Sequence, residues 1–380
     1  MFNIDDDSSG EPAAVRARDL SVTFDGNPGR WNAITDVPGL EVGTTTLVAN
    51  DPVVTRTGVT AILPRGKSKA ALPSAAGISV LNGNGELSGR SWIEESGQLQ
   101  TPIVITNSHA VGAAHSGVDR WMAANFPASA AAWMLPVVGE TWDGYLNSIN
   151  AETVRPEHAV AALDAASSGP VAEGNVGGGT GMNCYGFKGG SGSSSRIVDY
   201  GTTAYTVGAF VQANFGARKE LTLSGHRLGR DSLAPNPMET TNWFEAELTG
   251  ARAVPGAGSV IVIIATDAPL LPAQCEALAR RVPLGLARTG TTGSHFSGDI
   301  FLCFSTANEG GLHSTMSGQG PVIESHDYLA WGQIDPLYEA VVQATEESVV
   351  NALVAAKDMQ GREGHMSFAL PHDEITTAFQ

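Results

Sequence analysis

The chain has 380 residues, enough to bury a large core, and 22 basic against 39 acidic residues give it a formal net charge of −17. An anionic surface of this size repels phosphate backbones and anionic lipid, so we expect neither nucleic acid nor a membrane as a partner. No linker divides the chain, and we expect one domain over residues 1–380 with an acidic, frayed head from Met1 to Glu11.

The first half of the chain mixes strand and helix patterns. Apolar runs predict strands at 59–63, 102–106 and 132–138. A helix is expected over 110–125, where apolar residues recur at helical spacing, and another over 158–166, with Pro156 in its first turn.

The second half continues with strands before helices. Alternation predicts antiparallel strands at 196–211 and 220–223, and buried strands follow Ser259 and cover 300–304. Helices are expected over 271–288, which Pro283 should kink or split, and over 336–357. Sheets covered by helices, without sustained β-α-β alternation, indicate an α+β sandwich.

The junction Gly256-Ala257-Gly258-Ser259 precedes a run of Val and Ile. Glycines admit backbone geometries that side chains forbid, so Ser259 Oγ could reach the Gly258 carbonyl and cleave the chain there. The freed α-amine, with an ordinary pKa of ~7.7–8.0, could then act as base for its own hydroxyl. Gly-Ser before a strand is also common turn chemistry, so an ordinary loop is the alternative.

Two further polar features accompany strands. Ser297 and Asp299 are one residue apart at the start of a strand and therefore share a face, where a hydroxyl and a carboxylate can orient an amine and carry protons. Asn214 follows an apolar strand, and its amide could donate to an oxyanion. A polar turn is the alternative for both.

Several common types of site are excluded because the sequence lacks their motifs. In the Gly-rich block 174–195, Lys188 is followed by Gly189, so no P-loop is present, and 179–184 breaks the dinucleotide pattern. We expect this backbone to pack against the wall of the active site, with Lys188 contributing charge there or standing in solvent. No His-Glu-x-x-His set and no Gly-x-Ser-x-Gly elbow occurs, so we expect no metal, no cofactor and no α/β-hydrolase triad.

Three cysteines, Cys184, Cys275 and Cys303, are odd in number and far apart. They fit free thiols in a reducing compartment better than a disulfide framework. The head lacks the n- and h-regions of a secretory signal, and no apolar run reaches the ~20 residues of a membrane span. We therefore expect a cytoplasmic protein. Cys184 as a nucleophile is a minor alternative, because buried free cysteines are mostly inert.

The junction Gly258-Ser259, its strand and the following Ala265-Thr266-Asp267-Ala268-Pro269-Leu270 resemble the autoproteolytic junction of the DmpA-type aminopeptidases, which include L-aminopeptidase/D-amidase-esterases and β-peptidyl aminopeptidases. Further similar blocks occur in the same order at 32–39, 56–60, 175–182 and 297–299. The resemblance implies an αββα sandwich comparable to amino-terminal-nucleophile hydrolases but differently connected. It also implies cleavage into an α chain, 1–258, and a β chain, 259–380, assembled as a homotetramer of αβ units.

The same resemblance assigns roles to single residues. Ser259 would be the nucleophile, Ser297-Gly298-Asp299 would assist it, and Asn214 and Tyr145 would hold the oxyanion. A substrate's protonated amine calls for a carboxylate, for which Glu140 is the candidate, with Asp143 behind it. A buried tyrosine with another partner, and solvated loop acids, are the alternatives.

Such an enzyme would release small N-terminal residues from peptides, amides or esters through an acyl-Ser259 intermediate. L-α-, D- and β-amino acids all remain open as substrates. Related nylon-oligomer hydrolases and ornithine acetyltransferases carry threonine at the junction, so Ser259 argues against both without excluding an amidase acting on non-peptide oligomers. An unprocessed, non-catalytic binding or assembly protein is the alternative of another class.

Overall fold

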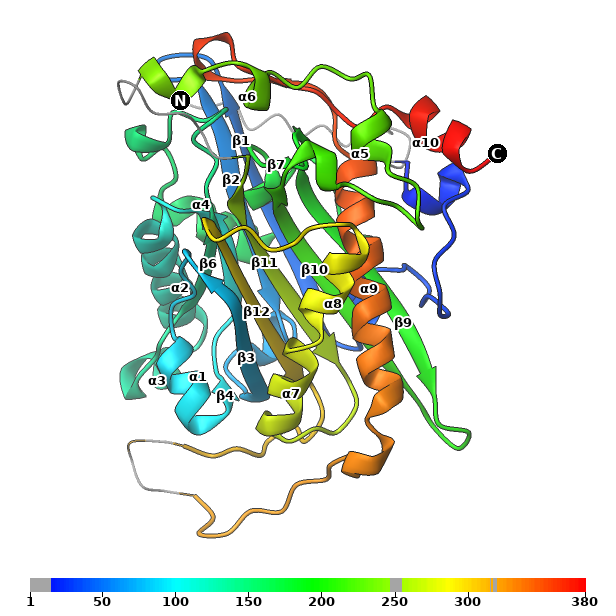
Figure 1. The fold of residues 1–380 in the computed structure, drawn as a ribbon. Coiled ribbons are helices and arrows are strands. Elements are labelled where there is room, and N and C mark those ends of the chain that lie inside the picture. The colour runs from blue at the N-terminus through cyan, green and yellow to red at the C-terminus, as the bar shows by residue number, and fades with distance from the viewer. Residues whose placement is uncertain (1–14, 247–254, 315, 317–319) are drawn as a thin grey trace.

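The computed structural model describes residues 15–246, 255–314, 316 and 320–380, so the predicted frayed head lies outside the described residues. Two β-sheets lie between two layers of helices (Figure 1). The four-stranded sheet has the order β1-β2-β5-β6, formed by Glu41–Ala49, Thr55–Leu63, Ile103–Asn107 and Val137–Thr141. The six-stranded sheet has the order β4-β3-β12-β11-β10-β9, formed by Gln98–Leu99, Ser74–Gly83, Ser297–Ser305, Gly256–Thr266, Ala204–Gly216 and Gly190–Asp199.

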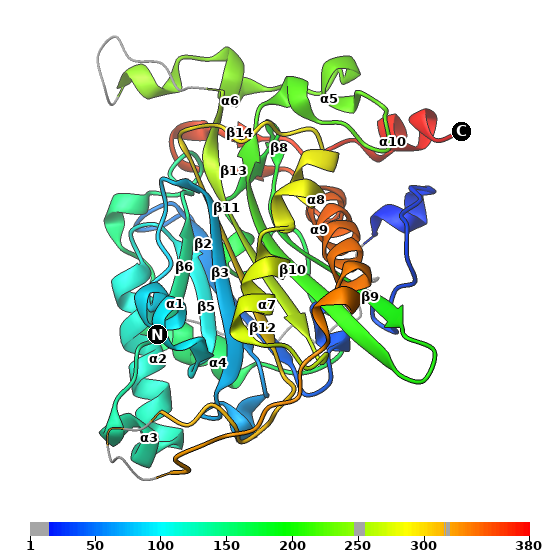
Figure 2. The same cartoon turned by 60° about the horizontal axis from the view of Figure 1, so that its bottom comes forward.

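Helices cover the outer face of each sheet (Figure 2). Beside the four-stranded sheet lie α2, α3 and α4, formed by Val111–Asn125, Pro127–Ala132 and Pro156–Asp164. Helix α1, Arg90–Ser96, instead contacts β3 and β4 at the edge of the six-stranded sheet. The six-stranded sheet is covered by α7, α8 and α9, formed by Pro272–Ala279, Val282–Arg288 and Asp335–Val354. Short elements complete the fold: α5, α6, α10, β7, β8, β13 and β14, at Leu228–Asp231, Pro237–Thr240, His372–Ala378, Asn183–Cys184, Phe187–Lys188, Met359–Gln360 and Met366–Ser367.

Strand β11 shows why this sequence forms a sheet buried on both faces. Val260, Val262 and Ile264 belong to the apolar cluster under α7, α8 and α9, whereas Ile261 and Ile263 belong to the cluster between the two sheets. Because side chains alternate along a strand, an unbroken apolar run serves both layers at once. The predicted α+β sandwich is confirmed.

Helix α9 explains the small residues of strand β9. A Cβ on Gly192 would lie 2.0 Å from the Ser348 carbonyl oxygen, so only glycine permits this approach. Ser194 Oγ donates to the Ala344 carbonyl of the same helix at 2.7 Å. The strand begins at Gly190, before the predicted start at Arg196. Its small Gly and Ser residues, which are typical of a loop, here allow the strand to pack closely against α9.

Two predicted strands are wrong in place or kind. Of 132–138 only the end is extended, because Pro127 begins a short helix that runs through alanines to Ala132, and β6 starts at Val137. Residues 220–223 contain the end of a 3₁₀ turn and a single bridge from Leu223 to His226. The apolar residues Leu221 and Leu223 are two apart because both side chains enter the apolar cluster under α7, α8 and α9. The spacing therefore reflects burial and not pairing in a sheet.

The expected break of the helix over 271–288 is confirmed. Helix α7 ends at Ala279 and α8 begins at Val282, with Pro283 in its first turn, where a missing N–H costs nothing. Within the described parts of the chain, every helix is too short or too polar to cross a membrane.

Candidate active site

Ser259 lies inside strand β11 rather than at its head, because the strand already begins at Gly256. It pairs with Asn214 of the antiparallel β10 and with Gly298 of the parallel β12. All three strands are central in the six-stranded sheet, and Ser259 is buried. The register therefore brings together three segments that are far apart in the sequence.

The side chains of Ser259 and Asn214 share the face that looks toward the four-stranded sheet. Ile261, two residues after Ser259, and Phe210, four residues before Asn214, both enter the cluster between the sheets. Gln212, between them on β10, donates to Thr106 O at 3.0 Å and to Thr141 Oγ1 at 2.7 Å. The carboxyl end of β6 is thus joined directly to this face.

Gly258, the residue before Ser259, is held tightly between strands. It pairs with Ser297, its N–H donates to Phe296 O at 3.2 Å, and an added Cβ would lie 1.9 Å from the Asn214 carbonyl oxygen. The pairing of β10 shifts register between Asn214 and Gly216. A side chain at 258 would force this backbone apart.

The Asn214 amide is oriented by two hydrogen bonds. Its Oδ1 accepts the Asn183 N–H at 2.9 Å, and its Nδ2 donates to the Trp142 carbonyl at 2.9 Å. Because an amide nitrogen carries two hydrogens, one stays available for a group beside Ser259. This geometry suits the predicted oxyanion contact.

Ser297 and Asp299 form a pair, as predicted. Ser297 Oγ donates to Asp299 Oδ1 at 2.5 Å, and Asn82 Nδ2 donates to Asp299 Oδ2 at 2.8 Å. Burial raises the pKa of the Asp299 carboxyl, and these hydrogen bonds partly oppose the rise. Their strand partners are Gly258 and Val260, so the pair flanks the backbone of Ser259 rather than its hydroxyl.

Glu140 lies at the end of β6, close to the same junction. Its carboxylate accepts the Glu86 N–H at 2.9 Å and the Ser108 hydroxyl. A Cβ on Gly85 would lie 3.2 Å from Glu140 Oε1 and 3.0 Å from the Cα of Gly298, the strand partner of Ser259. Burial raises the pKa of Glu140, against the Ser108 hydrogen bond.

Asp143 has hydrogen-bond partners other than those of Glu140. It is fully buried, accepts Asn147 Nδ2 at 3.0 Å, and burial raises its pKa to about 7. Of the two acids predicted for the substrate amine, the geometry favours Glu140 alone.

The Tyr145 hydroxyl is engaged away from Ser259. Its hydroxyl donates to Met366 O at 3.1 Å, and its ring stacks on His365 and meets Trp243 edge-on. Burial raises the pKa of Tyr145 to about 12, so it stays a donor at neutral pH. An oxyanion contact would require this O–H to leave Met366.

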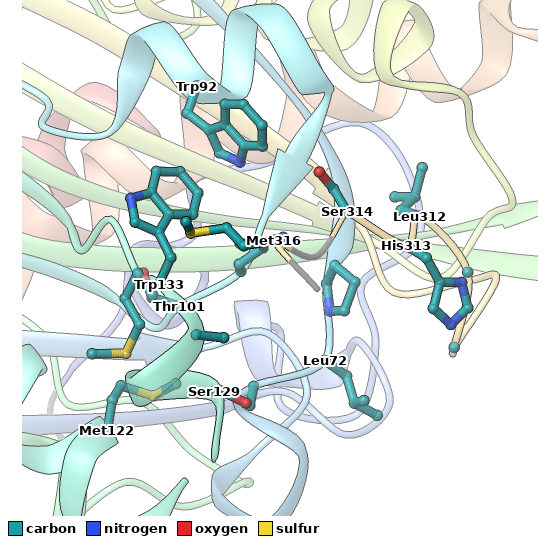
Figure 3. A pocket seen from close by; sticks show the side chains of 17 residues that line it. Leu72, Trp92, Thr101, Met122, Ser129, Trp133, Leu312, His313, Ser314 and Met316 are labelled. Atoms are coloured by element: carbon teal, nitrogen blue, oxygen red, sulfur yellow. The ribbon is translucent and has the colours of Figure 1, made fainter. Parts of the chain in front are cut away.

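Of two cavities, one borders the junction Gly256-Ala257-Gly258-Ser259 and the other does not. One of about 30 Å³ touches Gly256 and Ala257 and is large enough for a water molecule. The other, about 450 Å³, is lined by Trp92, Trp133 and residues of the segment after β12 (Figure 3). Its lining includes residues that follow the far end of β12, the end opposite Ser297, and none of the predicted site residues lines it. Among the described residues, no cluster of three His, Cys, Asp or Glu side chains could bind a metal.

Comparison with known proteins shows the family of the chain. Residues 32–367 match the profile of Peptidase family S58. The chain belongs to this family. Its similarity to the β-peptidyl aminopeptidase BapA of Sphingosinicella microcystinivorans is 46% identity over 369 residues, 95% of this chain and 90% of the relative.

Solved structures match this S58 peptidase over nearly its whole length. A Burkholderia sp. β-aminopeptidase has a TM-score of 0.85 and 43% identity, covering 96% of this chain and 98% of its own. The L-aminopeptidase D-Ala-esterase/amidase of Ochrobactrum anthropi, a prototype of the serine aminopeptidases, has a TM-score of 0.85 and 42% identity, covering 95% and 96%. Its fold is a variant of the Ntn hydrolase fold. The predicted family and enzyme class are confirmed: the chain is a hydrolase of the aminopeptidase type.

Sequence reasoning missed Gln212 and left the place of Lys188 open. Gln212 shares the face of Phe210 and Asn214 at a spacing of two, and that alternation was a usable signal. Lys188, for which a solvated position was an open alternative, is fully buried. Its location depends on the pairing of short strands, which no local pattern predicts.

Proposed function

We propose that this peptidase cleaves itself between Gly258 and Ser259 and that Ser259 becomes its N-terminal nucleophile. The observation that carries the proposal is the register that sets Ser259 opposite Asn214 and beside Ser297-Gly298-Asp299. The tight packing of Gly258 against β10 supports it as well. The resulting chains would span residues 1–258 and 259–380.

In the first reaction, Ser259 Oγ attacks the Gly258 carbonyl carbon while Asn214 Nδ2 donates to the oxyanion. The C–N bond breaks, the proton lost by the hydroxyl is passed to the Ser259 nitrogen, which Ser297 and Asp299 flank, and an ester remains. Water, for which the cavity beside Ala257 has room, then hydrolyses that ester. The products are the Gly258 carboxylate and a Ser259 with free hydroxyl and amine.

In turnover, the free amine takes the proton of its own hydroxyl, which attacks the substrate carbonyl. Ser297 and Asp299 hold that amine from the side on which they flank the backbone. Asn214, with Tyr145 once its hydroxyl leaves Met366, stabilises the oxyanion, and Glu140 binds the substrate's ammonium group. Loss of the amine leaving group gives acyl-Ser259, and water completes the hydrolysis.

The substrates proposed are peptides, amides or esters with a small N-terminal L-α-, D- or β-amino acid. Similarity to β-peptidyl aminopeptidases and to an L-aminopeptidase D-Ala-esterase/amidase supports this range. Amidase action on non-peptide oligomers and an uncut, non-catalytic assembly role are the alternatives. A cytoplasmic homotetramer fits the family resemblance and the three free, buried cysteines.

The deciding experiment is the mass of the purified chain under denaturing conditions. We expect two fragments, roughly two thirds and one third of the 39.4 kDa chain, the smaller beginning with Ser259. Ser259→Ala should give a folded, full-length, inactive chain. Cleavage of that variant, or a wild type that stays whole and is not acylated by a serine-directed inhibitor, would rule out the mechanism.

A further inference from the structure

Lys188 is a buried cation close to the proposed oxyanion site. It lies in β8, which pairs with β7 at the end of the sheet where β11 begins (Figure 2). The side chain is fully buried, and its Nζ donates to Met182 O at 2.7 Å, Gly189 O at 2.8 Å and Gly179 O at 3.4 Å. An ammonium group removed from water must have such partners.

One of these carbonyls leads directly to Asn214. The Met182–Asn183 peptide unit accepts the Lys188 Nζ–H at its oxygen, while its N–H donates to Asn214 Oδ1 at 2.9 Å. The amide of Asn214 in turn donates one hydrogen to Trp142 O. A continuous chain of hydrogen bonds therefore runs from the Lys188 ammonium through a single peptide to the amide opposite Ser259.

This chain has a defined polarity. Positive charge at the Met182 oxygen draws electrons from the peptide, which makes the Asn183 N–H a stronger donor. That bond polarises the Asn214 amide, so its free Nδ2 hydrogen becomes a better donor to developing negative charge. The Asn183 bond also prevents the amide from turning its oxygen toward Ser259.

We propose that Lys188 is a positioning residue for catalysis, which orients and polarises the Asn214 amide through the Met182–Asn183 peptide. The inference rests on the proposed function, because it needs Asn214 at the oxyanion. The buried Asp143 carboxylate supports the charge of Lys188 electrostatically: burial lowers the pKa of Lys188 to about 7, and Asp143 opposes that fall.

The test is a double-mutant cycle between Lys188→Met and Asn214→Ala. The measurements are kcat and KM for a chromogenic amide of a small amino acid, and the rate of self-cleavage after cell-free synthesis. Asn214→Ala should lower kcat ~10²–10³-fold, as expected for an oxyanion donor, and Lys188→Met about 10-fold with KM unchanged. In the Asn214→Ala background, Lys188→Met should add no further loss.

The controls separate positioning from folding. Cys184→Ala removes a buried side chain from the same hairpin and should leave kcat within twofold. Lys188→Gln, which retains an amide NH2 as donor without charge, should fall between wild type and Lys188→Met. Failure of both Lys188 variants to fold would assign this lysine to folding alone and overturn the inference.

The outcomes also distinguish this inference from the proposed function. A Lys188→Met enzyme with normal kcat, or losses that multiply in the double variant, would overturn the positioning role while leaving Asn214 in place. If Asn214→Ala itself kept normal turnover and self-cleavage, the oxyanion assignment of the proposed function would be wrong. The two failures therefore give different results.

Discussion

At the scale of single residues, Gly258 sets the geometry of the proposed cleavage. Gly258→Ala would place a Cβ 1.9 Å from the Asn214 carbonyl, so β11 must move away from β10. Since a displacement of 1 Å at reacting groups can cost ~10²-fold, we expect self-cleavage to slow by about that factor. A time course of fragment appearance on denaturing gels measures it.

Gly112→Ala is the matched control for Gly258→Ala. Its added Cβ would meet no atom within 4 Å, and alanine suits its position in α2. This variant should mature at the wild-type rate. Normal cleavage of Gly258→Ala would show that the Asn214 backbone does not constrain the junction.

Asp299 makes both proposed reactions dependent on pH. Its carboxylate must be ionised to assist the Ser259 nitrogen, and burial raises its pKa, so the acid limb of self-cleavage, which precedes the free amine, should lie above the ordinary ~3.9 of aspartate. Asp299→Asn should abolish this limb and slow self-cleavage and turnover ~10²–10⁴-fold. Both pH profiles, measured side by side, test the assignment.

Asp267 provides the comparison for Asp299. Just beyond the opposite end of β11, it accepts the Thr206 N–H at 2.6 Å, and burial raises its pKa too. Asp267→Asn should leave the acid limb in place. An unchanged limb in Asp299→Asn would remove Asp299 from the proton path.

At the scale of elements, an ion network joins α9 to β9 and to the start of the described chain. Glu347 of α9 accepts Arg196 Nη2 at 2.7 Å and Arg18 Nε at 2.7 Å. Burial would raise the pKa of Glu347, but the hydrogen bond from Arg18 and the charge of Arg196 lower it overall. Its stabilisation is therefore present above the unfolded-state pKa of ~4.3 and is lost as pH falls through the folded-state value.

Glu347→Ala would leave the Arg196 guanidinium buried without its partner. We expect the free energy of unfolding at pH 7 to fall by about 3–5 kcal/mol, measured by urea denaturation, and this difference to shrink in acid. Glu346→Ala, which removes the partner of the half-exposed Arg288, should cost less than about 1 kcal/mol. Equal losses in the two variants would contradict a role for burial.

Local patterns predicted the elements that have a clear period of their own. The helix at Val111–Asn125 and the buried strand after Ser259 follow from the spacing of apolar residues alone. Strand β3 gives no such signal, because its small residues make room for α7: a Cβ on Gly77 would lie 2.3 Å from the Glu276 nitrogen. Contacts of that kind depend on partners far along the chain.

The candidate site likewise contains residues that a local motif indicates and residues whose place depends on distant parts of the chain. Ser259, Ser297 and Asp299 stand in recognisable motifs, from which the sequence alone proposes them. The route from Lys188 to Asn214 needs the pairing of Asn183 with Lys188 and a peptide hydrogen bond to β10, neither of which has a sequence signature. Motifs indicate the proposed reacting groups, whereas the orientation of those groups is a property of the folded sheet.

At the scale of the whole molecule, the proposed cut falls in the middle of the six-stranded sheet. After cleavage, β11 would belong to the β chain, yet it would still pair with β10 of the α chain from Ser259 to Thr266. Helix α9 of the β chain also covers β9 and β10 of the α chain. The two chains therefore share one core, in which each buried Val or Ile of β11 contributes about 1.5–3 kcal/mol.

We expect the cut enzyme to stay together until it unfolds. Native size-exclusion chromatography should give one species that contains both chains in equal amounts, and denaturant should release them in the same transition that abolishes activity. The uncut Ser259→Ala variant should elute at the same volume, because cleavage removes no packing from the sheet. Separation of the chains in native buffer would mean that the junction had held the sheet together, which the ladder between β10 and β11 argues against.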